Sequence, residues 1–311
     1  MIRRTLITAV FLSALSIWGT TECLSGDGDA GTRSAQFLKL GVGGRAVAMG
    51  GAFVGVADDA TAIYWNPAGL ASVNATELSF MHLSWLQDVS YEYFALAQPI
   101  KKWAVFGWSM SYLHMDKLQG RDQQGEPTSD FTASDMAITL AFGRKITSSL
   151  LVGGSIKSID EKIDDRNAYG LAFDVGCLYL TPVENLFLGG VIQNWGKDIT
   201  FVEESFRLPT VFKLGASYRR MLAGNPTNLA VDVYFPTDNR TCLHSGIEYV
   251  YKNTIAGRIG YKNGSDLGDT AGFSFGLGLM TTKSQTFRID YAFVPQGGLG
   301  NSHTFSLSIS F

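Results

Sequence analysis

The stretch Phe37–Ala71, FLKLGVGGRAVAMGGAFVGVADDATAIYWNPAGLA, is far richer in glycine and alanine than an ordinary globular segment. Its glycines permit positive φ and close backbone approach, so the segment can pack against walls supplied by the rest of the chain. Asp58 or Asp59 is expected to cap a short helical turn over 60–65, and Asn66 to cap a second turn that begins at Pro67. The pattern predicts a plug inside a larger structure.

The residues expected to shape this plug are Gly41, Gly43, Gly44, Arg45, Gly50, Gly51, Asp58, Asp59, Asn66, Pro67 and Gly69. The run SAQFLKLGVGGRAVAMGGAFVGVADDATAIYWNPAGLA, residues 34–71, resembles the N-terminal signature of the PorV/PorQ family. Members of that family are outer-membrane β-barrels related to the FadL-type fatty-acid channels. The resemblance covers roughly an eighth of the chain. It implies a barrel in a bacterial outer membrane with this segment in its lumen.

The first residues indicate export from the cytoplasm. Arg3 and Arg4 precede an apolar run from Leu6 to Ile17, which is the order of a secretory signal peptide and is too short to span a bilayer. We therefore expect a signal peptide at 1–23, a linker and lumenal plug at 24–74, and a transmembrane barrel at 75–311.

Composition narrows the class of protein. Beyond the signal peptide no stretch of 18 consecutive apolar residues occurs, which argues against a helical membrane protein although 46% of residues are hydrophobic. Charged residues make up 17%, aromatics 12%, and there are 35 glycines, which suits a sheet with one lipid-facing side. A net charge of -3 argues against a nucleic-acid partner. Cys177 and Cys242 are expected to be free thiols.

From Thr76 onward, polar and apolar residues alternate with period 2, interrupted by turn residues at the spacing of barrel strands. Leu171 and Phe173, for example, alternate with Ala172 and Asp174. We expect an all-β fold, an antiparallel barrel of about fourteen strands. The alternation slips within 78–85, where we expect a β-bulge.

The connections between these strands are expected to alternate in length, because outer-membrane barrels have short periplasmic turns and longer external loops. Long polar segments are expected at 116–130, 160–167, 196–209, 263–270 and 295–303, and tight turns at 145–149, 181–185, 224–227, 252–254 and 281–285. Phe311 ends an amphipathic strand and resembles the signal read by the outer-membrane insertion machinery. That machinery and the lipids of the outer membrane are therefore expected partners.

Seven charged residues fall on the strand faces that alternate with the apolar ones: Asp174, Lys213, Asp232, Glu248, Arg258, Arg288 and Asp290. Both signs are present, so no single-sign ion filter is evident. We interpret these residues as partners for one another and for plug groups such as Arg45, Asp58 and Asp59. The alternative is a polar lining along a substrate path.

Three hypotheses for function follow. The leading one is a non-enzymatic component of protein export, similar to type IX secretion, or of outer-membrane assembly, as the PorV-like members of the family suggest. The alternative is a FadL-like channel for passive uptake of hydrophobic small molecules. The third is an outer-membrane enzyme, but His244 and Glu248, the nearest approach to a catalytic pair, lie roughly 13 Å apart along one strand. The glycines at 41–46 match a dinucleotide fingerprint without the parallel sheet it needs. No cofactor, metal or nucleic acid is expected.

Overall fold

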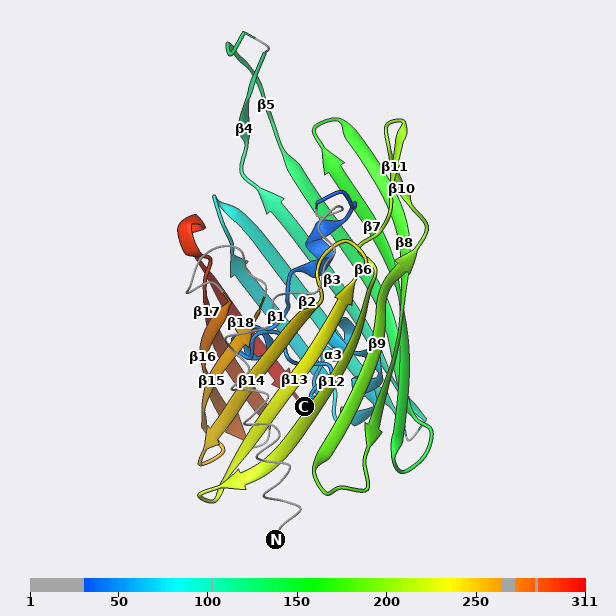
Figure 1. The fold of residues 1–311 in the computed structure, drawn as a ribbon, viewed down its shortest axis with the longest axis vertical. Coiled ribbons are helices and arrows are strands. Elements are labelled where there is room, and N and C mark those ends of the chain that lie inside the picture. Colours follow the sequence, from blue (N-terminus) through cyan, green and yellow to red (C-terminus); the bar gives the residue numbers. More distant parts are fainter. Residues whose placement is uncertain (1–30, 102, 123, 264–271, 283–284) are drawn as a thin grey trace.

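The computed structural model describes residues 31–101, 103–122, 124–263, 272–282 and 285–311. Within this part of the chain, fourteen antiparallel strands close into one barrel, in the order β1-β18-β17-β16-β15-β14-β13-β12-β9-β8-β7-β6-β3-β2 (Figure 1). The predicted all-β barrel of about fourteen strands is therefore confirmed. The expected signal peptide at 1–23 lies outside the described residues.

Neighbouring barrel strands follow one another in the chain, apart from two hairpins inserted into the connections. The barrel strands are β1 Glu77–Ser84, β2 Val89–Ile100, β3 Ala104–Met115, β6 Ala133–Lys145, β7 Leu150–Ile163, β8 Arg166–Leu180, β9 Leu186–Gly196, β12 Val211–Leu222, β13 Asn225–Pro236, β14 Cys242–Tyr251, β15 Ile255–Lys262, β16 Phe273–Thr282, β17 Thr286–Pro295 and β18 Asn301–Ser310. The hairpins pair β4 Leu118–Arg121 with β5 Pro127–Phe131, and β10 Ile199–Phe201 with β11 Glu204–Phe206.

The helical elements are short: η1 Gln36–Lys39, α2 Gly44–Ala48, α3 Ala62–Trp65, η2 Pro67–Ser72 and η3 Gly297–Leu299. In the described part of the chain, none of the helices has both the length and the apolarity needed to cross a membrane. Cys177 and Cys242 form no disulfide among the described residues.

Side chains alternate between the outside of the barrel and its lumen, as the period-2 pattern predicts. On β8, Val175 is 62% exposed whereas its neighbour Asp174 is 1% exposed. Large apolar side chains such as Leu140, Leu277 and Phe305 are exposed on the outer surface. An apolar exterior over a partly polar interior is the arrangement of a barrel that stands in lipid.

The bulge expected within 78–85 is a wrong prediction. β1 pairs with β2 and β18 over its whole length without a register shift. The pattern seemed to slip because Met81 and Leu83 are apolar yet buried inside the barrel, where the Gly43 N–H contacts the Met81 sulfur. A register shift occurs instead between β8 and β9, at Phe173 and Val175.

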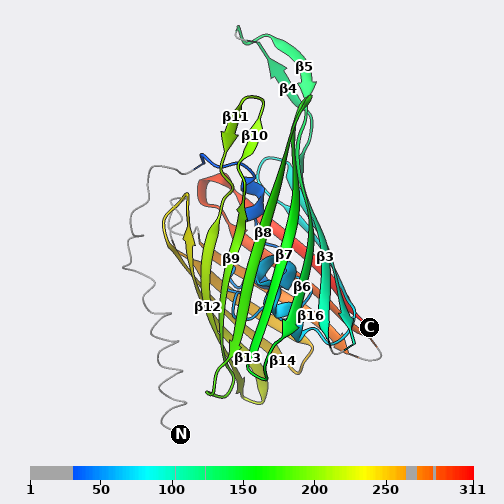
Figure 2. The ribbon, with the colours of Figure 1, turned by 90° about the vertical axis from the view of Figure 1, so that its right-hand side faces the viewer.

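The two rims of the barrel differ. One rim, here called the loop end, carries the β4–β5 hairpin, which projects well beyond the barrel, and the β10–β11 hairpin (Figures 1 and 2). The opposite rim, the turn end, carries the tight turns at 146–149, 181–185 and 252–254. The long connection expected at 160–167 is a wrong prediction, because β7 and β8 extend to Ile163 and from Arg166 and leave a two-residue turn. The expected connections at 263–270 and 281–285 include residues outside the described ranges.

Residues 36–72 fold inside the lumen, where Figure 1 shows them in blue between the strands. Here this segment is called the plug. Helix α2 packs against β15 to β18, and η2 packs against β6 to β8 on the other side. Wall glycines allow this close packing: a Cβ at Gly176 would lie 2.1 Å from the Asn66 side-chain oxygen. The hydrophobic core therefore lies between the plug and the inner wall, and not within either alone.

Candidate functional site in the barrel lumen

The plug has little regular structure of its own. Asn66 caps η2 as predicted, since its side-chain oxygen accepts a hydrogen bond from the Ala68 N–H at 3.2 Å, with Pro67 at the first position. The expected cap of the preceding helix is corrected: α3 begins after Thr61, and Asp59 accepts the Thr61 N–H at 3.0 Å just before it. Gly69 is required by close approach, because a Cβ there would lie 2.2 Å from the Ala57 carbonyl oxygen.

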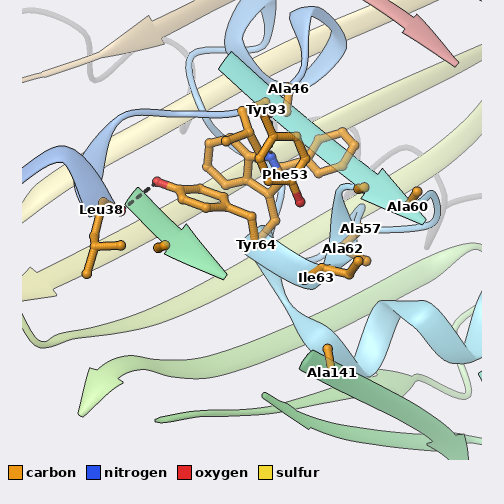
Figure 3. Packing of buried hydrophobic residues seen from close by; sticks show 14 of the residues in the cluster. Leu38, Ala46, Phe53, Ala57, Ala60, Ala62, Ile63, Tyr64, Tyr93 and Ala141 are labelled. Atoms are coloured by element: carbon orange, nitrogen blue, oxygen red, sulfur yellow. Dashed lines mark hydrogen bonds between the residues drawn. The ribbon is translucent and has the colours of Figure 1, made fainter. Parts of the chain in front are cut away.

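Three aromatic side chains form the centre of the plug. The rings of Phe53 and Tyr64 lie 6.0 and 4.9 Å from that of Trp65. Figure 3 shows Phe53 and Tyr64 beside Tyr93 of β2, with the Tyr64 hydroxyl donating a hydrogen bond to the Leu38 carbonyl at 3.1 Å. The alanines around them are fully buried. Aromatic burial thus joins the plug to the wall.

Arg45 of α2 connects the plug to the wall electrostatically. Its guanidinium donates from Nε and Nη2 to the two carboxylate oxygens of Glu248 on β14, each at 2.9 Å. Its Nη1 donates to Asp58 at 2.6 Å and to Asp59 at 3.2 Å. A bidentate guanidinium–carboxylate pair is among the strongest polar contacts in proteins.

The wall extends this network. Arg258 donates to Glu248 at 2.7 Å and to Asp290 at 2.8 Å, and Arg288 donates to Asp59 at 2.9 Å. The connected groups, here called the charge cluster, are Arg45, Asp58, Asp59, Glu77, Arg219, Glu248, Arg258, Arg288 and Asp290. Both signs alternate through the cluster, so each buried charge has at least one opposite neighbour.

The charge cluster shifts the pKa values of the plug residues Asp59 and Arg45. Burial favours the neutral form of the Asp59 carboxyl, but attraction to Arg288 and Arg45 and hydrogen bonds from Thr61 outweigh it and lower the pKa of Asp59. Burial likewise acts to lower the pKa of Arg45, but Asp58 and Glu248 raise it well above its ordinary value. Both side chains are therefore charged at neutral pH.

Polar wall residues also hold the plug backbone. Asp232 accepts the N–H groups of Phe53 and Val54 at 2.7 and 2.8 Å. Ser217 donates to the Gly55 carbonyl at 2.7 Å, and Tyr234 donates to the Gly51 carbonyl at 2.6 Å. These bonds satisfy backbone groups that would otherwise be buried without partners.

The seven predicted lumen-facing charges all lie inside the barrel, but they have three different environments. Glu248, Arg258, Arg288 and Asp290 join the charge cluster, and Asp232 binds the plug backbone. Asp174 pairs within the wall, with Lys157 at 2.8 Å.

The seventh charge, Lys213, joins neither group and is described below. Arg219, which donates to Asp58 at 2.9 Å, and Glu77 were missed by sequence reasoning. Glu77 is the first residue of β1, whereas Arg219 lies within β12 on the same face as Lys213, so strand phase could have found Arg219.

A cavity of about 580 Å³ lies between the plug and the barrel wall, toward the loop end. The plug residues Val47, Gly51 and Trp65 contribute to its floor, and the side walls include Trp85 and Tyr234. This volume is within the usual range of about 300–1,000 Å³ for small-molecule sites. In the described part of the chain, no group of three or more His, Cys, Asp or Glu side chains could hold a metal ion.

Comparisons with known proteins agree with this architecture. The sequence profile of an uncharacterised protein family (UPF0164) matches residues 16–158. No curated protein matches the chain.

Among solved structures, the Pseudomonas putida toluene transporter TodX is similar with 13% identity and a TM-score of 0.60, over 86% of this chain and 96% of that one. The Ralstonia pickettii toluene transporter TbuX has 14% identity and a TM-score of 0.59, over 86% and 97%. A Pseudomonas aeruginosa FadL homologue has 10% identity and a TM-score of 0.52, over 87% and 98%. At such low identity these likenesses show the fold alone, that of the closed barrel.

Proposed function

We propose that the protein is a non-enzymatic outer-membrane channel that admits hydrophobic small molecules. The observation that carries the proposal is the lumenal cavity, which lies toward the loop end and has the plug as its floor. Aromatic and aliphatic side chains, including Trp65, Trp85 and Leu83, line it. Such concave, mostly apolar cavities are typical of ligand sites. The likeness to two toluene transporters supports the proposal at the level of fold.

A whole-cell uptake assay tests this role. The full chain is expressed in a Gram-negative host with an intact lipopolysaccharide layer, and entry of a neutral aromatic probe such as naphthalene is followed over time. The test position is Val294, which lines the cavity. The control position is Val233, which follows the lumen-facing Asp232 on β13 and therefore points outward. Both valines are partly exposed. Val294→Trp should slow entry, and the matched control Val233→Trp should not. Equal entry with both variants and with the empty vector would contradict the proposal.

A role in protein export, the PorV-like function, is the second candidate. It is favoured by the β4–β5 hairpin, which stands clear of the barrel and offers exposed backbone and side chains to a protein partner (Figure 2). Replacing residues 118–131 by a short Gly-Ser turn would abolish secretion of cargo proteins if the hairpin captures them. Unchanged secretion, together with slowed naphthalene entry in Val294→Trp, would leave the channel as the function.

A further inference from the structure

Lys213, on β12, is buried without an anionic partner. Its side chain points into the lumen and the residue is 4% exposed. Among the described residues it makes no ion pair or hydrogen bond. The attraction of Asp232 and Asp174 reaches it, but neither forms an ion pair with it. Asp232 binds the N–H groups of Phe53 and Val54, and Asp174 pairs with Lys157. A buried ammonium without a paired anion is costly, so a ligand that supplies a carboxylate would favour the charged form of Lys213 and pair with it.

Aromatic rings surround this ammonium. The Lys213 nitrogen lies 4.1 Å from the ring centre of Tyr234, 5.5 Å from that of Trp65 and 5.8 Å from that of Tyr64. The ring of His244 stacks on Tyr234 at 3.9 Å and 17°. Cation–π contacts offset only part of the burial cost. They also leave flat apolar faces beside the charge.

The position of Lys213 places it at the floor of the cavity. Two residues toward the loop end on the same strand face, Val211 lines the cavity. Two residues toward the turn end, Gly215 packs against the plug, where a Cβ would lie 2.9 Å from Val54. Lys39 and Lys262 also line the cavity, and no Asp or Glu does within the described chain. Lys39 is paired with Asp238, so its charge is already balanced. The cavity is closed below Lys213 by the plug.

We propose that the cavity binds an aromatic carboxylate, with the carboxylate on Lys213 and the ring against Tyr234, Trp65 and Tyr64. This inference rests on the proposed channel function and names a substrate class for it. In an aromatic carboxylate the charged group and the ring are directly joined. The site has the same spacing, because the aromatic side chains lie within about 6 Å of the Lys213 ammonium, the usual reach of a cation–π contact. A neutral hydrocarbon leaves Lys213 unpaired. A long alkyl acid supplies the carboxylate but no flat aromatic face to lie against these rings.

Isothermal titration calorimetry on the purified full chain tests this assignment. The probes are 2-naphthoate, its neutral relative 2-methylnaphthalene, and hexadecanoate. Lys213→Met removes the charge and keeps most of the side-chain length, while Lys213→Arg keeps the charge. Lys252 is the matched control, because it also lies over an aromatic ring, Tyr251 at 5.1 Å, but in a turn at the opposite end of the barrel. Heat-dependent migration in gels shows whether each variant barrel is folded.

We expect wild type, Lys213→Arg and Lys252→Met to bind 2-naphthoate, and Lys213→Met to bind it at least about tenfold more weakly, the change that corresponds to one lost charged contact. Binding of 2-methylnaphthalene should change little in any variant. Equal loss in Lys252→Met, or no loss in Lys213→Met, would overturn the role of Lys213. Hexadecanoate binding as tightly as 2-naphthoate would overturn the aromatic class.

If naphthalene enters cells but 2-naphthoate does not bind, the inference fails and the channel stands. If 2-naphthoate binds but no probe enters, the channel fails and the site stands.

Discussion

Arg45→Met should loosen the plug without unfolding the barrel. The substitution removes four charged contacts, to Asp58, Asp59 and both oxygens of Glu248. Removing one partner of a buried ion pair typically costs about 3–5 kcal/mol. Glu248 keeps Arg258 at 2.7 Å and Asn228 at 2.7 Å, so its charge is not left alone. We therefore expect the lower limit, about 3 kcal/mol.

The substitution should lower the free energy of plug opening by this amount and leave that of barrel unfolding unchanged, because the lost contacts join α2 to other plug residues and to β14. At about 1.4 kcal/mol per factor of ten, opening should become about a hundredfold more frequent. Hydrogen exchange measures such local opening directly. Peptides that contain Phe53 and Val54, whose N–H groups bind Asp232, should exchange about a hundredfold faster, while peptides from β7 and β8 should not change.

Two control variants make the measurement specific. Arg45→Lys keeps the charge but loses the bidentate geometry, so its exchange should fall between wild type and Arg45→Met. Arg166→Met changes an exposed arginine at the loop end and should leave exchange in the plug as it is in wild type. An increase of less than tenfold in plug exchange for Arg45→Met, or an equal increase in β7 and β8, would refute the reasoning.

Four further outcomes are expected. Deleting residues 33–71 while keeping the signal peptide should leave an inserted barrel that conducts ions in planar bilayers and admits large antibiotics; conduction no greater than that of the intact chain would show that the segment does not close the pore. Deleting Phe311 or replacing it with Asp should lower the amount of protein in outer-membrane fractions, because the residue ends the strand expected to be read during insertion, and normal membrane levels would remove that signal. In a chain without native cysteines, an impermeant thiol label applied to whole cells should reach cysteines placed at 116–130 but not at 252–254, and the reverse pattern would overturn the orientation. Gly69→Ala should destabilise the plug by about 1–3 kcal/mol through overpacking against Ala57, seen as faster exchange of plug peptides only, and unchanged exchange would contradict the packing argument.

The barrel could be predicted from sequence because strand alternation is a local property. Phe173 and Val175 face outward and Asp174 inward whatever the neighbouring strand does, since side chains on a strand alternate with period 2. The failure of this reasoning at 78–85 has a physical cause. Met81 and Leu83 are apolar on the lumen face because the plug covers them, so hydrophobicity no longer distinguishes inside from outside.

The sequence could therefore predict that each of these charged side chains faces the lumen. It could not predict how far along the barrel axis each one lies or which residue it contacts. Arg45 and Glu248 are 203 positions apart in the chain, and they meet only because strand register brings Glu248 of β14 within reach of the Arg45 side chain. Lys213 and Asp232 have the same pattern signature as Glu248, yet one lies among aromatic rings and the other binds the plug backbone. Alternation specifies a side of the sheet, whereas contact depends on the register of neighbouring strands and on how the plug folds. The sequence by itself thus determined a plugged barrel with charges inside it. Only the tertiary structure decided which charges hold the plug and which one is left facing the cavity.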